Sequence, residues 1–88
     1  MEVIEIEKKL QSELPLSFVK VEGDGSHFQV IAVGDCFADV SRIKRQQMIY
    51  GPLQAQISDG SIHALTIKTF TEAQWQKDKK LLFPDLAD

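Results

Sequence analysis

The sequence of 88 residues predicts a single α/β domain of the α+β kind, spanning residues 1–88, with the element order helix, strand, strand, helix, strand, helix. Three observations predict it. Apolar residues recur at helical spacing near the start, and two runs rich in β-branched and aromatic residues then flank a Gly/Asp turn. A connection of about 27 residues that contains a helix leads to a third such run. Because a long crossover returns a strand parallel to its predecessor, we expect a three-stranded mixed sheet with the helices packed on it.

The first helix is expected over residues 2–14, where apolar side chains recur every three or four positions and acidic residues precede basic ones. Pro15 ends this helix, because its ring cannot continue the helical hydrogen bonding. Strands are expected over residues 18–22 and 28–33. The intervening run, residues 23–26, is Gly-Asp-Gly-Ser, which is typical of a hairpin turn.

A central helix is expected to begin near Arg42, with either Asp39 or Ser41 as its N-cap. Pro52, which follows a glycine, favours either a kink or a break in this helix, since proline removes a backbone donor. The expected buried stripe of the helix is Ile43, Gln47, Tyr50, Leu53 and Ile57.

The third strand is expected over residues 62–70. A last helix should start at Thr71, because Gln74 three residues later completes a capping box. Trp75 is expected to seat this helix on the sheet. Residues 81–88 are expected to form a flexible tail.

Composition excludes several classes of protein. No apolar run approaches the roughly 20 residues that cross a bilayer, and the N-terminus lacks the basic start of a signal peptide. The single cysteine, Cys36, cannot form an internal disulfide, so we expect a cytoplasmic protein without membrane contact. No triad, carboxylate pair or phosphate loop is present, so we do not expect an enzyme. The free protein is expected to be a monomer or a weak homodimer.

Two histidines stand where two parallel strands are expected to begin. His27 precedes the second strand and His63 lies at the start of the third, so both imidazoles should reach the same sheet edge. Two such side chains provide half of a metal site. From pattern alone the alternatives are a packed, hydrogen-bonded His63 on the face of Leu65 and Ile67, and an ordinary loop residue at position 27.

Three groups of residues, which together cover nearly the whole chain, form a recognisable pattern. They are Gly23-Asp24-Gly25-Ser26-His27-Phe28-Gln29-Val30, Ser41-Arg42-Ile43-Lys44-Arg45-Gln46-Gln47 with Tyr50-Gly51-Pro52-Leu53, and Ile62-His63-Ala64-Leu65-Thr66-Ile67 with Thr71 and Trp75. With this pattern the chain resembles the short bacterial members of the BolA family.

This resemblance implies the BolA fold, which is similar to the class II KH fold. It also implies a partner of monothiol glutaredoxins that shares a [2Fe-2S] cluster in a heterodimer and acts in iron-sulfur trafficking or in iron and stress regulation. The family histidine that matches His63 is a cluster ligand, and His27 stands at the second ligand position. The glutaredoxin is expected to contribute its cysteine and a glutathione thiolate. Two imidazoles can replace two thiolates on one iron, as in Rieske centres.

The alternative function is a KH-like transcriptional regulator that binds DNA. Arg42, Lys44 and Arg45 open the central helix and Lys68 lies on the third strand, which is a candidate basic patch for nucleic acid or for a protein partner. A net charge of −3 and the absence of a Gly-X-X-Gly loop argue against nucleic-acid binding. The same patch would also suit an acidic face of glutaredoxin or the charged tail of bound glutathione.

Cys36 is the alternative sulfur ligand. It stands beyond the second strand, at the opposite end from His27, and we expect a half-buried structural thiol.

Overall fold

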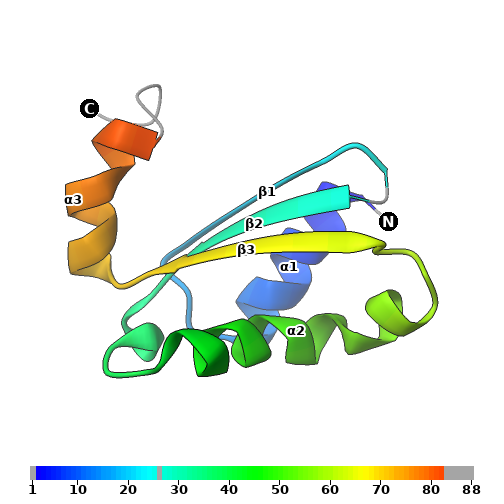
Figure 1. The fold of residues 1–88 in the computed structure, drawn as a ribbon, viewed down its shortest axis with the longest axis horizontal. Helices are drawn as coiled ribbons and strands as arrows, with labels where there is room; N and C mark the ends of the chain where they lie inside the picture. Colours follow the sequence, from blue (N-terminus) through cyan, green and yellow to red (C-terminus); the bar gives the residue numbers. More distant parts are fainter. Residues whose placement is uncertain (1, 26, 83–88) are drawn as a thin grey trace.

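The computed structural model describes residues 2–25 and 27–82, which form three helices, three strands and one short 3₁₀ turn (Figure 1). The predicted order of helices and strands is confirmed. The elements are α1 (Val3–Glu13), β1 (Phe18–Gly23), β2 (His27–Val33), the 3₁₀ turn η1 (Asp35–Phe37), α2 (Arg42–Ser58), β3 (Ala64–Phe70) and α3 (Glu72–Leu82).

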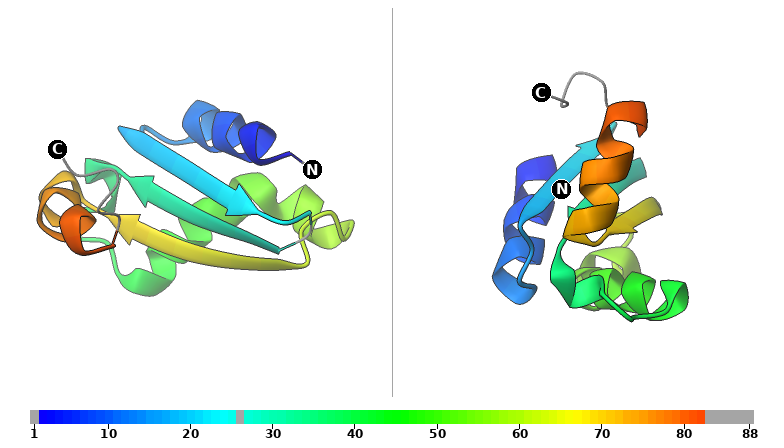
Figure 2. Two further views of the ribbon diagram at one scale, coloured as in Figure 1. Left: turned by 90° about the horizontal axis from the view of Figure 1, so that it is seen from above. Right: turned by 90° about the vertical axis from the view of Figure 1, so that its left-hand side faces the viewer.

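The sheet has the order β1-β2-β3 and is mixed, as expected. β1 pairs with β2 in antiparallel fashion through the hairpin, and β2 pairs with β3 in parallel fashion. The hairpin turn and the loop that enters β3 therefore lie at one end of the sheet, and α3 lies at the other end (Figure 2). Only β2 has a strand on both sides, so β1 and β3 are the edges of the described sheet.

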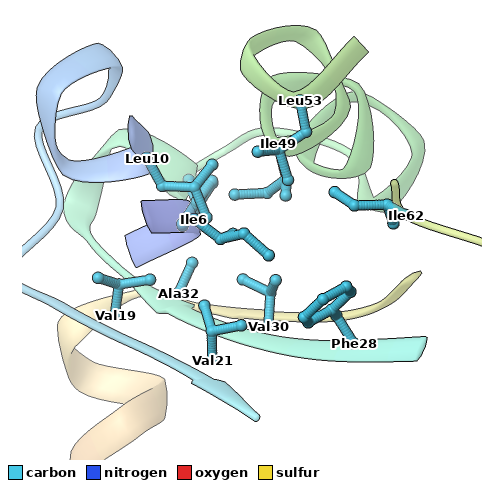
Figure 3. Close-up of a cluster of buried hydrophobic side chains, with 11 residues drawn as sticks. Ile6, Leu10, Val19, Val21, Phe28, Val30, Ala32, Ile49, Leu53 and Ile62 are labelled. Atoms are coloured by element: carbon cyan, nitrogen blue, oxygen red, sulfur yellow. The ribbon is translucent and has the colours of Figure 1, made fainter. Parts of the chain in front are cut away.

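Helices α1 and α2 cover one face of the sheet and build the main core with it (Figures 2 and 3). The alternation of β1 and β2 directs every second side chain into this core, as a half-buried sheet requires. The buried members are Ile6, Leu10, Val19, Val21, Phe28, Val30, Ala32, Phe37, Ile49, Leu53 and Ile62.

Helix α2 is capped by Ser41, whose side-chain oxygen accepts the backbone N–H of Lys44 at 3.3 Å. The helix runs through Pro52 to Ser58, so the expected alternative of a break is wrong. The expected buried stripe is also wrong in part, because Ile43 is 70% exposed whereas Ile49 and Leu53 are fully buried. At 3.6 residues per turn Ile43 lies about 120° around the helix from Ile49 and misses the sheet.

Helix α3 packs on the opposite face of the sheet, at its far end. Trp75 is 6% exposed and its ring stacks on Phe18 and tilts against Phe70, with centroid distances of 5.3 Å to each. Ile31 and Val33 complete this second cluster. The expected seating of the last helix by Trp75 is confirmed.

The capping box of α3 is also confirmed, because the Thr71 hydroxyl accepts the Gln74 N–H and Gln74 Oε1 accepts the Thr71 N–H. The helix extends to Leu82, so residues 81 and 82 belong to it rather than to a tail. The rest of the expected tail, residues 83–88, lies outside the described residues.

Candidate functional site

The register of β2 and β3 brings the two histidines together. His27 is the first residue of β2 and pairs with Ala64, the first residue of β3. His63 comes directly before Ala64, so both histidines lie at the same end of the sheet. The imidazole rings of His27 and His63, called here the histidine pair, have centroids 6.5 Å apart and an interplanar angle of 88°. The predicted convergence of the two imidazoles is therefore found in the structure.

The hairpin turn holds His27 in place through Asp24. The Asp24 carboxylate accepts the backbone N–H of His27 at 3.3 Å, and the Asp24 N–H donates to the His27 carbonyl at 3.2 Å. Gly25 has a φ of 115°, a backbone conformation that side chains with a Cβ rarely adopt. Asp24 Oδ1 also lies 3.8 Å from His27 Nδ1, which leaves Nε2 as the nitrogen for another partner.

Both rings of the histidine pair face solvent. The side chain of His27 is 64% exposed, and His63 is also exposed. The pattern-based alternative of a packed His63 is wrong, because β3 begins at Ala64 and His63 belongs to the loop before it. The alternation that fixes the face of Leu65 and Ile67 does not extend to a residue outside the strand.

A shallow pocket of about 320 Å³ adjoins His27. It lies on the same face of the sheet as α3, at the end that α3 does not cover, and its lining includes the acidic residues Glu22 and Asp24. Within the described residues no three side chains of His, Cys, Asp or Glu are placed to hold one metal ion. The histidine pair therefore brings together two potential metal ligands, and no third ligating side chain of the described residues joins them. The pocket is lined by Glu22, Gly23, Asp24, His27, Phe28, Gln29, Ala64 and Thr66.

Cys36 lies far from the histidine pair. It follows the carboxyl end of β2 in η1, whereas His27 begins β2, and a strand of this length spans about 20 Å. The thiol is half-buried and packs against the main core. Burial raises the pKa of the Cys36 thiol above its usual value, and the neighbouring Asp35 carboxylate adds to this rise. These surroundings match the expected structural thiol.

Three of the four predicted basic residues come together at a different place. Arg42, Arg45 and Lys68 line a second pocket of about 420 Å³ between the first turns of α2 and the carboxyl half of β3. Lys44 is exposed on α2 and does not line it. This pocket, called here the basic groove, is lined by Val40, Arg42, Arg45, Gln46, Ile67, Lys68, Thr69 and Phe70.

The side chain of Arg45 is fixed in the basic groove. Its Nε donates to the Val40 carbonyl at 3.0 Å and its Nη1 donates to Gln74 Oε1 at 3.2 Å, which ties α2 to α3. The guanidinium also lies 6.0 Å from the centroid of the Phe37 ring. Sequence reasoning identified the cations but not this anchoring, because Gln74 lies 29 positions further along the chain.

Sequence and structure comparisons agree on the relatives of this chain. The chain is 54% identical over 81 residues to the acid stress protein IbaG of Escherichia coli K12, covering 92% of this chain and 96% of that protein. It is 34% identical over 82 residues to the DNA-binding transcriptional regulator BolA of Vibrio cholerae, covering 82% of this chain and 76% of that protein.

Among solved structures, BolA1 from Arabidopsis thaliana matches with a TM-score of 0.74 and 28% identity, covering 84% of this chain and 98% of that one. No helix in the described part of the chain is long and apolar enough to span a membrane. The family model for BolA-like proteins matches residues 2–74, which is most of the chain. On these grounds the protein belongs to the BolA family.

Proposed function

We propose that this protein binds a monothiol glutaredoxin and co-ligates a [2Fe-2S] cluster with it, and that it acts in iron-sulfur trafficking or in iron and stress regulation. The observation that carries the proposal is the histidine pair, two exposed imidazoles 6.5 Å apart at one sheet edge. Exposed histidines that face each other have no role in the core, since neither contributes to either buried cluster.

The spacing of the histidine pair suits ligation of one metal atom after a small adjustment. Two imidazoles bound to one tetrahedral metal through nitrogen bonds of about 2 Å have ring centroids roughly 5 Å apart. The rings stand 6.5 Å apart here, so a closure of about 1.5 Å is needed. Both side chains are exposed, so rotation about their own side-chain torsions has room to supply this adjustment.

The chemistry of the donors supports the cluster over a single ion held by this chain alone. Only two ligating side chains converge within the described residues, so a partner has to complete the coordination. In the proposed complex the glutaredoxin cysteine and a glutathione thiolate bind one iron, and His27 and His63 bind the other. Neutral imidazoles in place of two thiolates reduce the negative charge around the cluster and raise its reduction potential.

The same proposal describes a binding protein in the cytoplasm rather than an enzyme. Cys36 follows the carboxyl end of β2, and His63 precedes the amino end of the parallel strand β3. The two side chains are therefore about one strand length apart and cannot act together as nucleophile and base. A raised thiol pKa also disfavours nucleophilic use of Cys36 near neutral pH.

Reconstitution with a monothiol glutaredoxin and glutathione tests the proposal. The cluster is assembled with the wild type, His27→Ala, His63→Ala and Cys36→Ala, and visible absorption and circular dichroism are recorded. We expect both histidine variants to lose the spectrum of the mixed complex and Cys36→Ala to retain it. An unchanged spectrum in His63→Ala, or its loss in Cys36→Ala with the fold intact, contradicts the proposed ligands.

A second candidate function is DNA binding, because the Vibrio cholerae relative is named as a DNA-binding regulator and the basic groove gathers three cations. A duplex requires cations spread along its phosphates, whereas these three share one pocket of about 420 Å³. Salt titration of binding to duplex DNA tests this candidate, since several phosphate contacts give a steep fall of log affinity with log salt.

A further inference from the structure

The basic groove lies along an open strand edge. Its lining includes Ile67 and Thr69, which point to the α2 side of the sheet, together with Lys68 and Phe70, which point to the other side. A pocket lined by consecutive residues of both faces runs along the edge of the strand rather than on one face. No strand of the described residues flanks β3 on that side.

The backbone of β3 presents unused hydrogen-bonding groups to the basic groove. The Gly34 N–H donates to the Phe70 carbonyl at 3.0 Å, so Phe70 directs its backbone toward β2. Successive residues of a strand alternate in this direction, and the N–H and C=O groups of Thr69 and Ile67 therefore point to the open edge. Such an edge is a template for an added strand.

The charges beside this edge lack an acidic partner among residues 2–25 and 27–82. Across the part of the chain that the structure describes, no ion pair involves Arg42, Arg45 or Lys68. Arg45 is held by two neutral oxygens, which leave its positive charge uncompensated. Three cationic side chains therefore line one groove, although the protein as a whole has a net charge of −3. A lysine on an edge strand discourages unspecific pairing with other strands. This function does not account for the two arginines of α2, Arg42 and Arg45, which line the same groove.

We propose that the basic groove docks an extended acidic peptide segment of a partner protein, which adds as a strand to the edge of β3 and places carboxylates against Arg42, Arg45 and Lys68. Backbone hydrogen bonds to Ile67 and Thr69 give affinity, and the cations select acidic side chains. The groove is at the carboxyl end of β3 and the histidine pair at its amino end, roughly 15 Å away along the strand. This docking surface is therefore distinct from the proposed cluster site, and it does not depend on metal.

The probe is a fluorescein-labelled nonapeptide of three Glu-Glu-Val repeats with blocked ends, which presents carboxylates on both faces of an added strand, titrated into the full-length protein without metal. Binding is measured by fluorescence anisotropy, and its place is mapped by amide NMR shifts. We expect the largest shifts at Ile67 and Thr69. The same peptide with N-methylated central residues keeps its charge but loses backbone donors, and it should bind at least roughly tenfold more weakly.

Protein variants separate the charge contribution. Arg42→Gln and Lys68→Gln should each weaken binding roughly two- to fivefold, which is the range for exposed ion pairs. Lys44→Gln is the matched control, because it removes a cation from the same helix outside the groove, and it should leave the affinity unchanged. Circular dichroism verifies that each variant is folded.

Three outcomes overturn the proposal. Equal binding of the N-methylated peptide shows charge attraction without strand addition. Tighter binding of a nine-nucleotide poly-dT strand at the same amides assigns the groove to nucleic acid instead. Absence of any shift in Ile67 and Thr69 with the acidic peptide shows that this edge docks no such segment.

Discussion

The rings of His27 and His63 meet edge to face at the end of the sheet where the parallel strands β2 and β3 begin, with their centroids 6.5 Å apart. This relationship depends on three separate features of the chain: the hairpin turn that starts β2, the crossover through α2, and the loop that enters β3. A change in any of them alters the proposed ligation without touching an imidazole.

Asp24 belongs to the first of these features, the hairpin turn. Asp24→Ala removes the acceptor of the His27 N–H and the carboxylate 3.8 Å from Nδ1, so His27 loses its fixed position. We expect cluster retention in the reconstituted complex to fall by about tenfold, the lower end of the effect of groups that orient metal ligands. Chelator challenge followed by visible absorption measures it. Asp24→Asn keeps an acceptor oxygen and should retain most of the cluster, and an equal loss in both variants contradicts the orienting role.

Gly23 and Gly51 differ in their tolerance of alanine. A Cβ on Gly23 would stand 2.3 Å from the Phe28 ring, whereas one on Gly51 meets no atom within 4 Å beyond its chain neighbours. Gly23→Ala should reduce the free energy of unfolding by about 1–3 kcal/mol through overpacking. Gly51→Ala, in the interior of α2, should change it by less than about 0.5 kcal/mol, because the better helix propensity of alanine is opposed by contact of its Cβ with the ring of the following Pro52. Urea denaturation compares the two, and equal losses in both variants contradict the crowding of Gly23 by Phe28.

Trp75 anchors α3 to the sheet through Phe18 and Phe70. Trp75→Ala should lower the free energy of unfolding by about 3 kcal/mol, because it empties a site that is 6% exposed. Denaturation followed by far-ultraviolet circular dichroism measures the loss. Lys77→Ala removes an exposed side chain of the same helix and should change stability by less than about 0.5 kcal/mol. Equal stabilities of the two variants contradict the anchoring role.

Cys36 should react slowly with iodoacetamide near neutral pH. Burial raises the pKa of its thiol, so the reactive thiolate forms only at higher pH than in a free cysteine. The raised pKa also means that the stabilisation of the folded protein by the neutral thiol is complete below the unfolded pKa and is lost as pH rises through the folded one. Alkylation rates against N-acetylcysteine, followed by mass spectrometry over a pH series, test this. A faster reaction than the free thiol at neutral pH contradicts it.

The sequence was sufficient for the element order, because each element carries its own local signal. The Thr71/Gln74 capping box and the Gly-Asp-Gly-Ser turn were readable from residues close in the chain. The length of the crossover then implied that the second and third strands are parallel neighbours. Because His27 and His63 stand at the starts of these strands, the parallel pairing predicted that their imidazoles lie at the same end of the sheet.

Features that depend on tertiary packing were not readable in the same way. The exposed position of Ile43 follows from where α2 crosses the sheet, and an apolar residue in the first turn of a helix does not reveal that direction. The basic groove likewise joins residues of α2 and β3 and is fixed by a hydrogen bond from Arg45 to Gln74. Spacing along the chain grouped Lys44 with the other cations, but the helix turns it away from the groove.

The central claim is that both imidazoles bind iron, and pulsed EPR of the reduced cluster tests it most directly. The complex is prepared with a monothiol glutaredoxin and glutathione, using this protein labelled with ¹⁵N only in its histidines. We predict hyperfine couplings from two distinct histidine nitrogens in the wild type and from one in a His27→Cys variant. A reduced cluster that shows no coupling to the labelled nitrogens would contradict the account.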